Sequence, residues 1–110
     1  MTIIDSHCHL NYEPLVNNVD DVINRASKIG VTHMLTISTK DKEFSSILKI
    51  LKNYKNVYGT YGIHPHEASS HLNISTNKIV ENLNKNKKII GIGETGLDFY
   101  YNNSDKKSQI

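Results

Sequence analysis

Two pairs of histidines and one glutamate are the side chains of this sequence best suited to chemistry. The first pair, His7 and His9, directly follows a short apolar run that begins at Thr2. Alternate side chains of a strand point to the same face, so His7 and His9 share one face with Asp5, and Cys8 takes the other. Neutral imidazole is a common ligand of zinc, manganese, iron and nickel. The spacing alone is equally compatible with two polar residues on a solvated strand end.

The second pair, His64 and His66, flanks Pro65 after another apolar run. Proline fixes the backbone of the turn between the two imidazoles. Parallel α/β folds place their ligands at the carboxyl ends of strands, and this pair stands at such an end of the predicted sheet. Considered by themselves, the two histidines are more simply explained as loop residues, one of them hydrogen-bonded to the backbone.

Glu94 emerges from a third apolar run, where Gly91 and Gly93 allow close approach of the backbone. A carboxylate at a strand end is costly to bury without a partner, so Glu94 should face a cation or a hydrogen-bond donor. A carboxylate that bridges two metal ions would meet this need. A helix N-cap or a salt bridge remains the alternative.

Four short apolar runs rich in β-branched residues predict the strands that position these side chains. The runs cover Thr2 to Asp5, Val31 to Ser38, Val57 to Ile63 and Lys88 to Gly93. Near-continuous apolar strands separated by helices indicate a parallel sheet. The three candidate motifs would then meet at the carboxyl edge of that sheet.

Apolar residues at helical spacing predict three helices between the strands. The first covers residues 19 to 29 and stops at Gly30, which suits a left-handed C-terminal cap. The second covers residues 44 to 51, with Thr39 placed as its N-cap. The third covers Ser75 to Asn84, and a fourth is expected to begin between Ser104 and Ile110.

Strand and helix repeat at the size of a βαβ unit, and four such units fill the 110 residues. An eight-fold β/α barrel typically takes about 250 residues. The predicted fold class is therefore α/β, the N-terminal half of a TIM-type barrel. Residues 1–110 would form one partial domain whose C-terminal half is missing.

Composition narrows the classes of function. A net charge of +2 is too small to attract a polyanion without a defined site. Cys8 is the single cysteine, so no intramolecular disulfide is possible, and a reducing cytosol fits best. Neither an export leader nor an apolar run approaching the ~18 residues of a membrane span is evident. We therefore expect a cytoplasmic protein without membrane contact.

Several further side chains are less suited to the site. His33 lies at the start of the second predicted strand and His71 in the loop after the third, both away from the convergence. Tyr100 and Tyr101 could stack on a base or a sugar. Aromatic residues that follow a strand more often pack over the end of the sheet, and packing is the favoured expectation for both.

The stretches Asp5 to Leu10, Gly62 to His66 and Gly93 to Asp98 resemble, in content, order and spacing, the N-terminal motifs of the TatD family of deoxyribonucleases. The resemblance implies a metal-dependent hydrolase of the amidohydrolase type that cleaves phosphodiester bonds of DNA. It implies two divalent ions per complete site, zinc, manganese or magnesium. His7 and His9 would bind one ion, and Glu94 would bridge to the second and act in catalysis.

The same resemblance places His64 and His66 near the substrate. In the family, two further histidines and an aspartate come from later strands, so the chain alone is expected to be impaired or inactive. The open edges and interior face of half a barrel invite association. Three interpretations therefore remain: a hydrolase from an interrupted gene, a half-barrel that needs a complementary chain or self-association, and a metal-binding remnant without activity.

Overall fold

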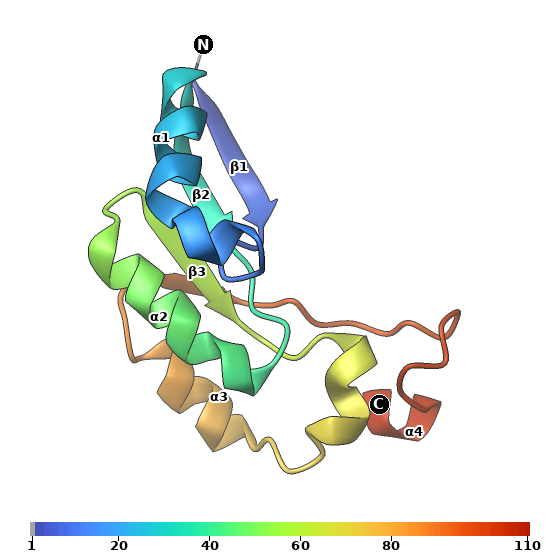
Figure 1. Cartoon of the computed structure of the whole chain (residues 1–110). Coiled ribbons are helices and arrows are strands. Elements are labelled where there is room, and N and C mark those ends of the chain that lie inside the picture. Colours follow the sequence, from blue (N-terminus) through green and yellow to red (C-terminus); the bar gives the residue numbers. More distant parts are fainter. Residues whose placement is uncertain (1) are drawn as a thin grey trace.

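The computed structural model describes residues 2–110, in which four strands alternate with helices (Figure 1). The elements are the strands β1 (Ile3–Cys8), β2 (Val31–Thr36), β3 (Val57–Tyr61) and β4 (Ile89–Ile92), the α-helices α1 (Val19–Lys28), α2 (Phe44–Asn53), α3 (Thr76–Leu83) and α4 (Lys106–Gln109), and the 3-10 helices η1 (Leu15–Asn18), η2 (Asp41–Glu43) and η3 (Pro65–Ser70). The strands form one parallel sheet in the order β1-β2-β3-β4. The predicted α/β class is confirmed.

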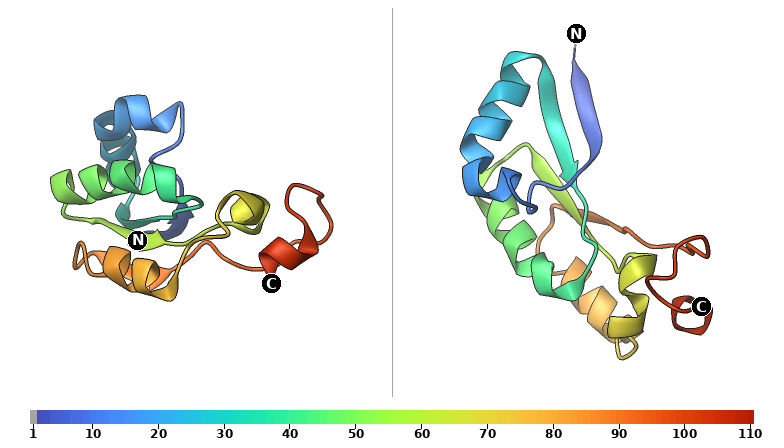
Figure 2. Two further views of the ribbon diagram at one scale, coloured as in Figure 1. Left: turned by 90° about the horizontal axis from the view of Figure 1, so that it is seen from below. Right: turned by 45° about the vertical axis from the view of Figure 1, so that its right-hand side comes forward.

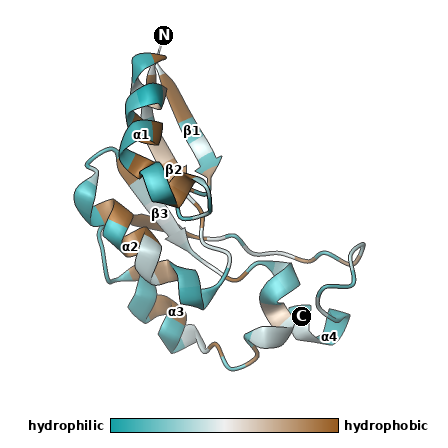
Figure 3. Cartoon of the chain, in the orientation of Figure 1, coloured by the Kyte–Doolittle hydropathy of each residue, from teal (hydrophilic) through white to brown (hydrophobic). Residues whose placement is uncertain are grey.

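Helices α1, α2 and α3 lie against the outer face of the curved sheet (Figure 2, right). Helix α1 packs on β2, α2 on β3, and α3 on β3 and β4. The hydrophobic residues of the helices and strands are coloured brown in Figure 3, and those of the core pack together in this layer. Ile47 and Leu51 of α2 and Val57 and Tyr61 of β3 are completely buried there. Since each such side chain contributes about 1.5–3 kcal/mol on burial, this layer is the core.

The opposite face of the sheet carries no helix among the described residues. Ile4 is 64% exposed and Ile90 59% exposed, and they line an open apolar depression with Leu35 and Tyr58. This is the uncovered interior face that half of a barrel was expected to present. Apolar patches of this kind are typical of surfaces that another segment covers.

The ends of several strands differ from the prediction. Strand β1 continues to Cys8, past its predicted end at Asp5, since Cys8 pairs with Thr36 after an irregularity in the register. Strands β2 and β3 end earlier than expected. The backbone N–H of Ser38 donates instead to the Thr60 hydroxyl, at 3.2 Å.

The helix ends follow the prediction with one exception. Gly30 has a φ of 98°, the left-handed conformation predicted for the end of α1. The prediction of Thr39 as the N-cap of α2 is wrong. Helix η2 precedes α2, and the Thr39 hydroxyl donates to the Glu43 carboxylate instead of accepting a backbone N–H. A short fourth helix, α4, begins after Asp105 as expected.

After β4, residues 93–105 form an irregular loop that ends in α4. The loop extends outward beyond the carboxyl ends of the strands, and helix α4 packs against η3 (Figure 1). Across residues 2–110, every helix is too short or too polar to cross a lipid bilayer.

Candidate metal centre

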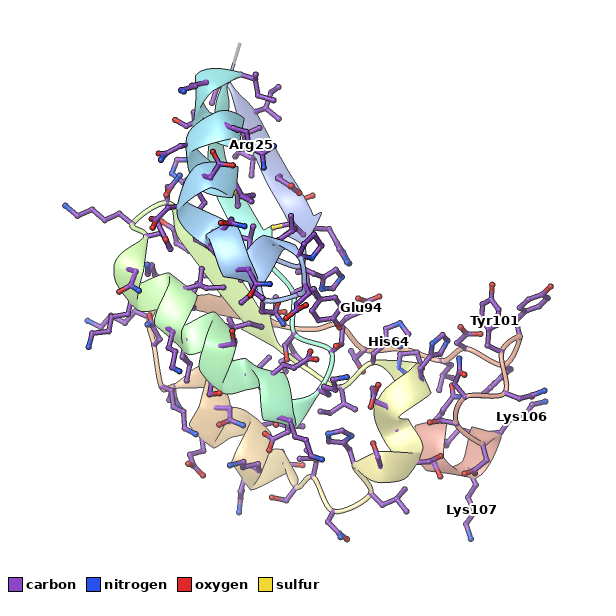
Figure 4. The ribbon with its side chains drawn as sticks, in the orientation of Figure 1. Arg25, His64, Glu94, Tyr101, Lys106 and Lys107 are labelled. Carbon is purple, nitrogen blue, oxygen red and sulfur yellow. The ribbon has the colours of Figure 1, made fainter. Side chains whose placement is uncertain are left out.

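The carboxyl edge of the sheet brings His7, His9 and Glu94 together from its first and last strands. Oε2 of Glu94 lies 3.5 Å from Nε2 of His7 and 4.0 Å from Nε2 of His9. Figure 4 shows Glu94 beside His64 at this edge, between the strand ends and η3. Side chains separated by more than eighty positions in the sequence thus share one small volume.

The three side chains fit a divalent metal ion. Their ligand atoms all lie within 4.8 Å of one another. In a tetrahedral site with bonds of about 2.1 Å, ligand atoms are roughly 3.4 Å apart, so small rotations suffice to coordinate one ion. Two imidazoles with one carboxylate are also the donor set of many hydrolytic zinc sites, which leave a position open. The predicted metal ligands are therefore compatible with one centre.

His9 is held in the form that coordinates a metal. Its Nδ1 lies 3.1 Å from the carbonyl oxygen of Ile37, which can only accept, so Nδ1 carries the hydrogen and Nε2 keeps its lone pair. The ring of Tyr12 stacks on the imidazole at 4.7 Å between centroids and 18° between planes. The Tyr12 hydroxyl in turn hydrogen-bonds with that of Thr39. Hydrogen bonding and stacking therefore fix both the tautomer and the orientation of His9.

Glu94 is positioned by backbone contacts between strand ends. Its N–H donates to the carbonyl oxygen of Ser38 at 2.6 Å, and the preceding N–H of Gly93 donates to Tyr61 at 3.0 Å. A Cβ on Gly62 would lie 2.5 Å from the carbonyl carbon of Gly93. Only glycine permits this approach, which places the end of β3 against the residue before Glu94.

His64 faces the same carboxylate with a different group. Its Nδ1 accepts the backbone N–H of His66 at 3.1 Å, which leaves the hydrogen of the neutral ring on Nε2. That Nε2 lies 3.5 Å from Oε1 of Glu94, the oxygen that does not face His7 and His9. His64 therefore presents a donor to the cleft, whereas His9 presents a lone pair.

His66 is paired with Asp98 from the loop after β4. Its Nε2 lies 2.7 Å from Oδ2 of Asp98. The hydrogen bond from His66, followed by the backbone N–H groups of Tyr101 and Tyr100, holds the pKa of the Asp98 carboxyl below its usual value. An ionised Asp98 can only accept, so Nε2 of His66 donates. The ring thus links the metal centre to the loop.

All five predicted site residues line one shallow cleft of about 350 Å³. Three further residues line it that the sequence did not predict as site residues: Tyr12, Thr39 and Glu67. The sequence pattern does not predict Tyr12 as a site residue. Its position depends on a backbone hydrogen bond from its N–H to the His9 carbonyl, at 3.0 Å, which folds the chain back. His33 and His71 lie outside the cleft, as expected.

The remaining polar groups near the centre have other roles. Burial raises the pKa of the Cys8 thiol to about 12, and its Sγ donates to the carbonyl of Leu35. Cys8 is thus a neutral packing residue on the face opposite His7, as the strand period predicted. At the rim, Lys40 pairs with Glu43 at 3.2 Å and with Glu67 at 3.7 Å, and these carboxylates raise the lysine pKa.

The expectation that Tyr100 and Tyr101 pack over the end of the sheet is wrong. Tyr100 is 84% exposed and Tyr101 56% exposed. The backbone N–H groups of both tyrosines donate to Asp98, at 3.0 and 3.3 Å, and turn the loop outward. The loop conformation therefore overrides the general tendency of aromatic residues to pack.

Comparison with known proteins identifies the family. A model described as "TatD related DNase" matches residues 4–110, so the chain belongs to this family of metal-dependent hydrolases. The resemblance drawn from the three motifs is confirmed. An "Uncharacterized metal-dependent hydrolase" of Buchnera aphidicola subsp. Baizongia pistaciae is 41% identical over 99% of this chain and 42% of its own length.

Two further similarities bear on fold and activity. The "3'-5' ssDNA/RNA exonuclease TatD" of Salmonella typhimurium is 33% identical over 97% of this chain and 41% of its own length. The crystal structure of YjjV, a TatD homologue of Escherichia coli K12, superposes with a TM-score of 0.73 at 26% identity. That match covers 97% of this chain and 40% of YjjV. The chain thus spans about two fifths of the length of these relatives.

Proposed function

We propose that the protein hydrolyses phosphodiester bonds of DNA with divalent metal ions, the first of which is held by His7, His9 and Glu94. The observation that carries the proposal is the convergence of these three side chains at one edge of the sheet. Membership of the TatD family and the nuclease name of the Salmonella relative support the substrate class.

The two oxygens of Glu94 have separate surroundings. Oε2 faces His7 and His9, whereas Oε1 faces the N–H of His64. We infer that Oε2 serves the first metal position and that Oε1 is available to a second, which is the bridging role expected of Glu94. The chemistry supplied there by a divalent ion would be Lewis-acid polarisation of a phosphoryl oxygen and acidification of water.

His64 and His66 are proposed as substrate-binding residues. The Nε2–H of His64 faces Oε1 of Glu94 within the cleft, and a non-bridging phosphate oxygen bound beside that carboxylate could accept from it as charge develops there. His66 lines the same cleft, held by Asp98 at 2.7 Å. A fixed donor adds more to transition-state stabilisation than a mobile one, because no reorganisation is needed during the reaction.

We further propose that a complementary segment or a second copy covers the open face of the sheet. The exposed Ile4 and Ile90 beside Leu35 and Tyr58 support this, as does the match of the chain to only part of each relative. On this proposal residues 1–110 form a partial barrel domain. A cytoplasmic location is also proposed, supported by the single cysteine.

The proposal is tested by hydrolysis of single-stranded DNA with added Mn²⁺ or Mg²⁺, comparing the chain with Glu94→Gln. Glutamine keeps the size of the side chain and removes its charge. Cleavage by the chain alone is expected to be weak, and the variant should lose whatever metal-dependent cleavage the native chain shows. Metal binding is measured on the same samples by calorimetry. Size-exclusion chromatography with light scattering reports whether cleavage accompanies self-association.

The outcomes separate the candidates. Cleavage that survives Glu94→Gln would contradict the assignment of the site. Metal binding without cleavage by the chain, at every association state observed, would contradict the hydrolase proposal and support a metal-binding protein without catalytic activity. Cleavage confined to the associated fraction would support a half-barrel that needs a second chain.

A further inference from the structure

The loop after β4 carries three aromatic residues that nothing in the proposed chemistry uses. Phe99 is 44% exposed, Tyr100 84% and Tyr101 56%. The two tyrosine rings lie 4.9 Å apart at 87°, and Tyr101 meets the edge of His66 at 5.6 Å. In Figure 4, Tyr101 lies beyond His64 along the edge that also carries Glu94. The aromatic pair therefore lies directly beside the cleft of the candidate metal centre.

The loop is held in place by side chains, so the rings project from a defined backbone. Oδ1 of Asp98 accepts the N–H groups of both tyrosines. The amide of Gln109 bonds to the N–H of Asp98 at 2.8 Å and to its carbonyl at 3.0 Å. Ser104 donates to the carbonyl of His66 at 2.8 Å, which fastens the loop to η3. Tyrosines presented in this way lose little conformational entropy when they bind.

A lysine side chain lies beside the third aromatic residue of this region. The ammonium of Lys106, the first residue of α4, lies 5.1 Å from the centroid of the Phe99 ring. The two nearby carboxylates have local partners: Asp98 accepts from His66, and Asp105 accepts from Ser108 at the start of α4. Lys107 points away from the tyrosines (Figure 4). One cation therefore accompanies the exposed rings.

We propose that Tyr100, Tyr101 and Lys106 form a second subsite, which binds the unpaired bases and a phosphate of single-stranded nucleic acid beside the metal cleft. Every base offers a π face, and stacking on exposed aromatic rings is the usual way in which proteins hold a single strand without reading its sequence. A duplex keeps its bases stacked on one another and cannot use these rings. The inference rests on the proposed function and assigns to this loop the contact with unpaired bases.

A binding experiment with the chelated protein tests this subsite apart from catalysis. The affinity for a fluorescein-labelled single-stranded oligodeoxynucleotide is measured by anisotropy in EDTA, and an abasic strand of equal length supplies the same backbone without bases. We expect Tyr100→Ala and Tyr101→Ala each to weaken binding of the normal strand by roughly 5-fold or more. Binding of the abasic strand should be unchanged in both variants.

Matched variants separate stacking from other effects. Tyr100→Phe keeps the ring and should bind like the native protein, whereas Tyr100→Leu keeps apolar area but lacks a π face and should bind like Tyr100→Ala. Lys106→Ala should weaken both strands and reduce the salt dependence, because it removes a phosphate contact. Lys107→Ala, the neighbouring lysine that points away, should have a smaller effect. Circular dichroism confirms that each variant is folded.

The subsite would be overturned if the native chain does not bind the normal strand, if it binds both strands equally, or if the tyrosine variants weaken both alike. Its failure is distinguishable from failure of the proposed function. Loss of cleavage in Glu94→Gln with unaltered tyrosine variants leaves the hydrolase and removes the subsite. Base-dependent binding without any cleavage leaves the subsite and removes the hydrolase.

Discussion

The two histidine pairs have the same spacing and different chemistry. His7 lies in strand β1 and His9 directly follows it, whereas His64 and His66 flank the proline that opens η3. In the first pair, the Ile37 carbonyl accepts a hydrogen bond from Nδ1–H of His9. The Nε2 of the neutral ring then keeps its lone pair for a metal. In the second pair, the Nδ1 of His64 accepts a backbone N–H, and its Nε2 becomes a donor.

The difference shows that spacing alone does not determine what an imidazole does. The partner of the second ring nitrogen decides the tautomer, and the tautomer decides between ligand and donor. The carboxylate of Glu94 lies between the two pairs and presents one oxygen to each. A metal ligand and a substrate donor can therefore lie on either side of one carboxylate.

The largest effect is expected from removing the first pair. His7→Ala with His9→Ala should weaken binding of Zn²⁺ or Mn²⁺ by more than roughly 100-fold, since even the loss of an outer partner of a ligand costs 10-fold to 100-fold. Titration calorimetry measures the affinity. His33→Ala, an exposed histidine outside the cleft, is the control and should bind normally. A double variant that keeps native affinity would refute the assignment of the ligands.

Removing His64 should affect catalysis far more than metal binding. His64→Ala takes away a donor aimed at the cleft, so hydrolysis should fall by about 100-fold to 1,000-fold. Metal affinity should change by less than about 10-fold, because the lost side chain is not a ligand. His64→Gln, which restores an N–H donor, should recover part of the rate. An affinity loss as large as that of the first pair would show that both pairs coordinate.

The close approach of the ends of β3 and β4 holds the two histidine pairs together. One added methyl group should disrupt it. Gly62→Ala would place a Cβ 2.5 Å from the carbonyl carbon of Gly93, and relief of that overlap should cost about 1–3 kcal/mol of the free energy of unfolding. Urea denaturation measures the loss. Gly91→Ala is the matched control, since its Cβ would meet nothing closer than 3.9 Å. Equal destabilisation by both changes would show that the close approach is unimportant.

The smallest effect is expected from protonation of Asp98, the carboxylate that pairs with His66. The pKa of Asp98 is lowered by His66, so the stabilisation it adds is complete above the usual carboxyl pKa of about 3.9 and is lost as the pH falls through the lowered value. We expect the backbone amide signals of Tyr100 and Tyr101 to keep their positions down to about pH 4 and to shift below it. A transition centred above pH 4 would contradict the pairing.

The sequence was sufficient to predict the sheet, the parallel direction of its strands and the edge at which the motifs meet. Apolar runs and glycine positions are local signals. It did not reveal the Tyr12 stack on His9 or the tautomer of His64, which depend on partners brought by turns. It also misplaced the cap of α2 at Thr39, whose hydroxyl takes a side-chain partner. The exposed Tyr100 was missed because the Asp98 turn that directs it is set by His66, which is 32 positions away.

The most direct test of the account is a long-range proton–nitrogen NMR spectrum of the imidazole rings during titration with Zn²⁺. The account predicts the Nδ1–H form for His9 and the Nε2–H form for His64 before metal is added. Zinc should then shift the Nε2 resonances of His7 and His9 and leave the Nε2 of His64 protonated. Loss of the Nε2 proton of His64 on metal binding, or no change at His7 and His9, would contradict the division of roles between the two pairs.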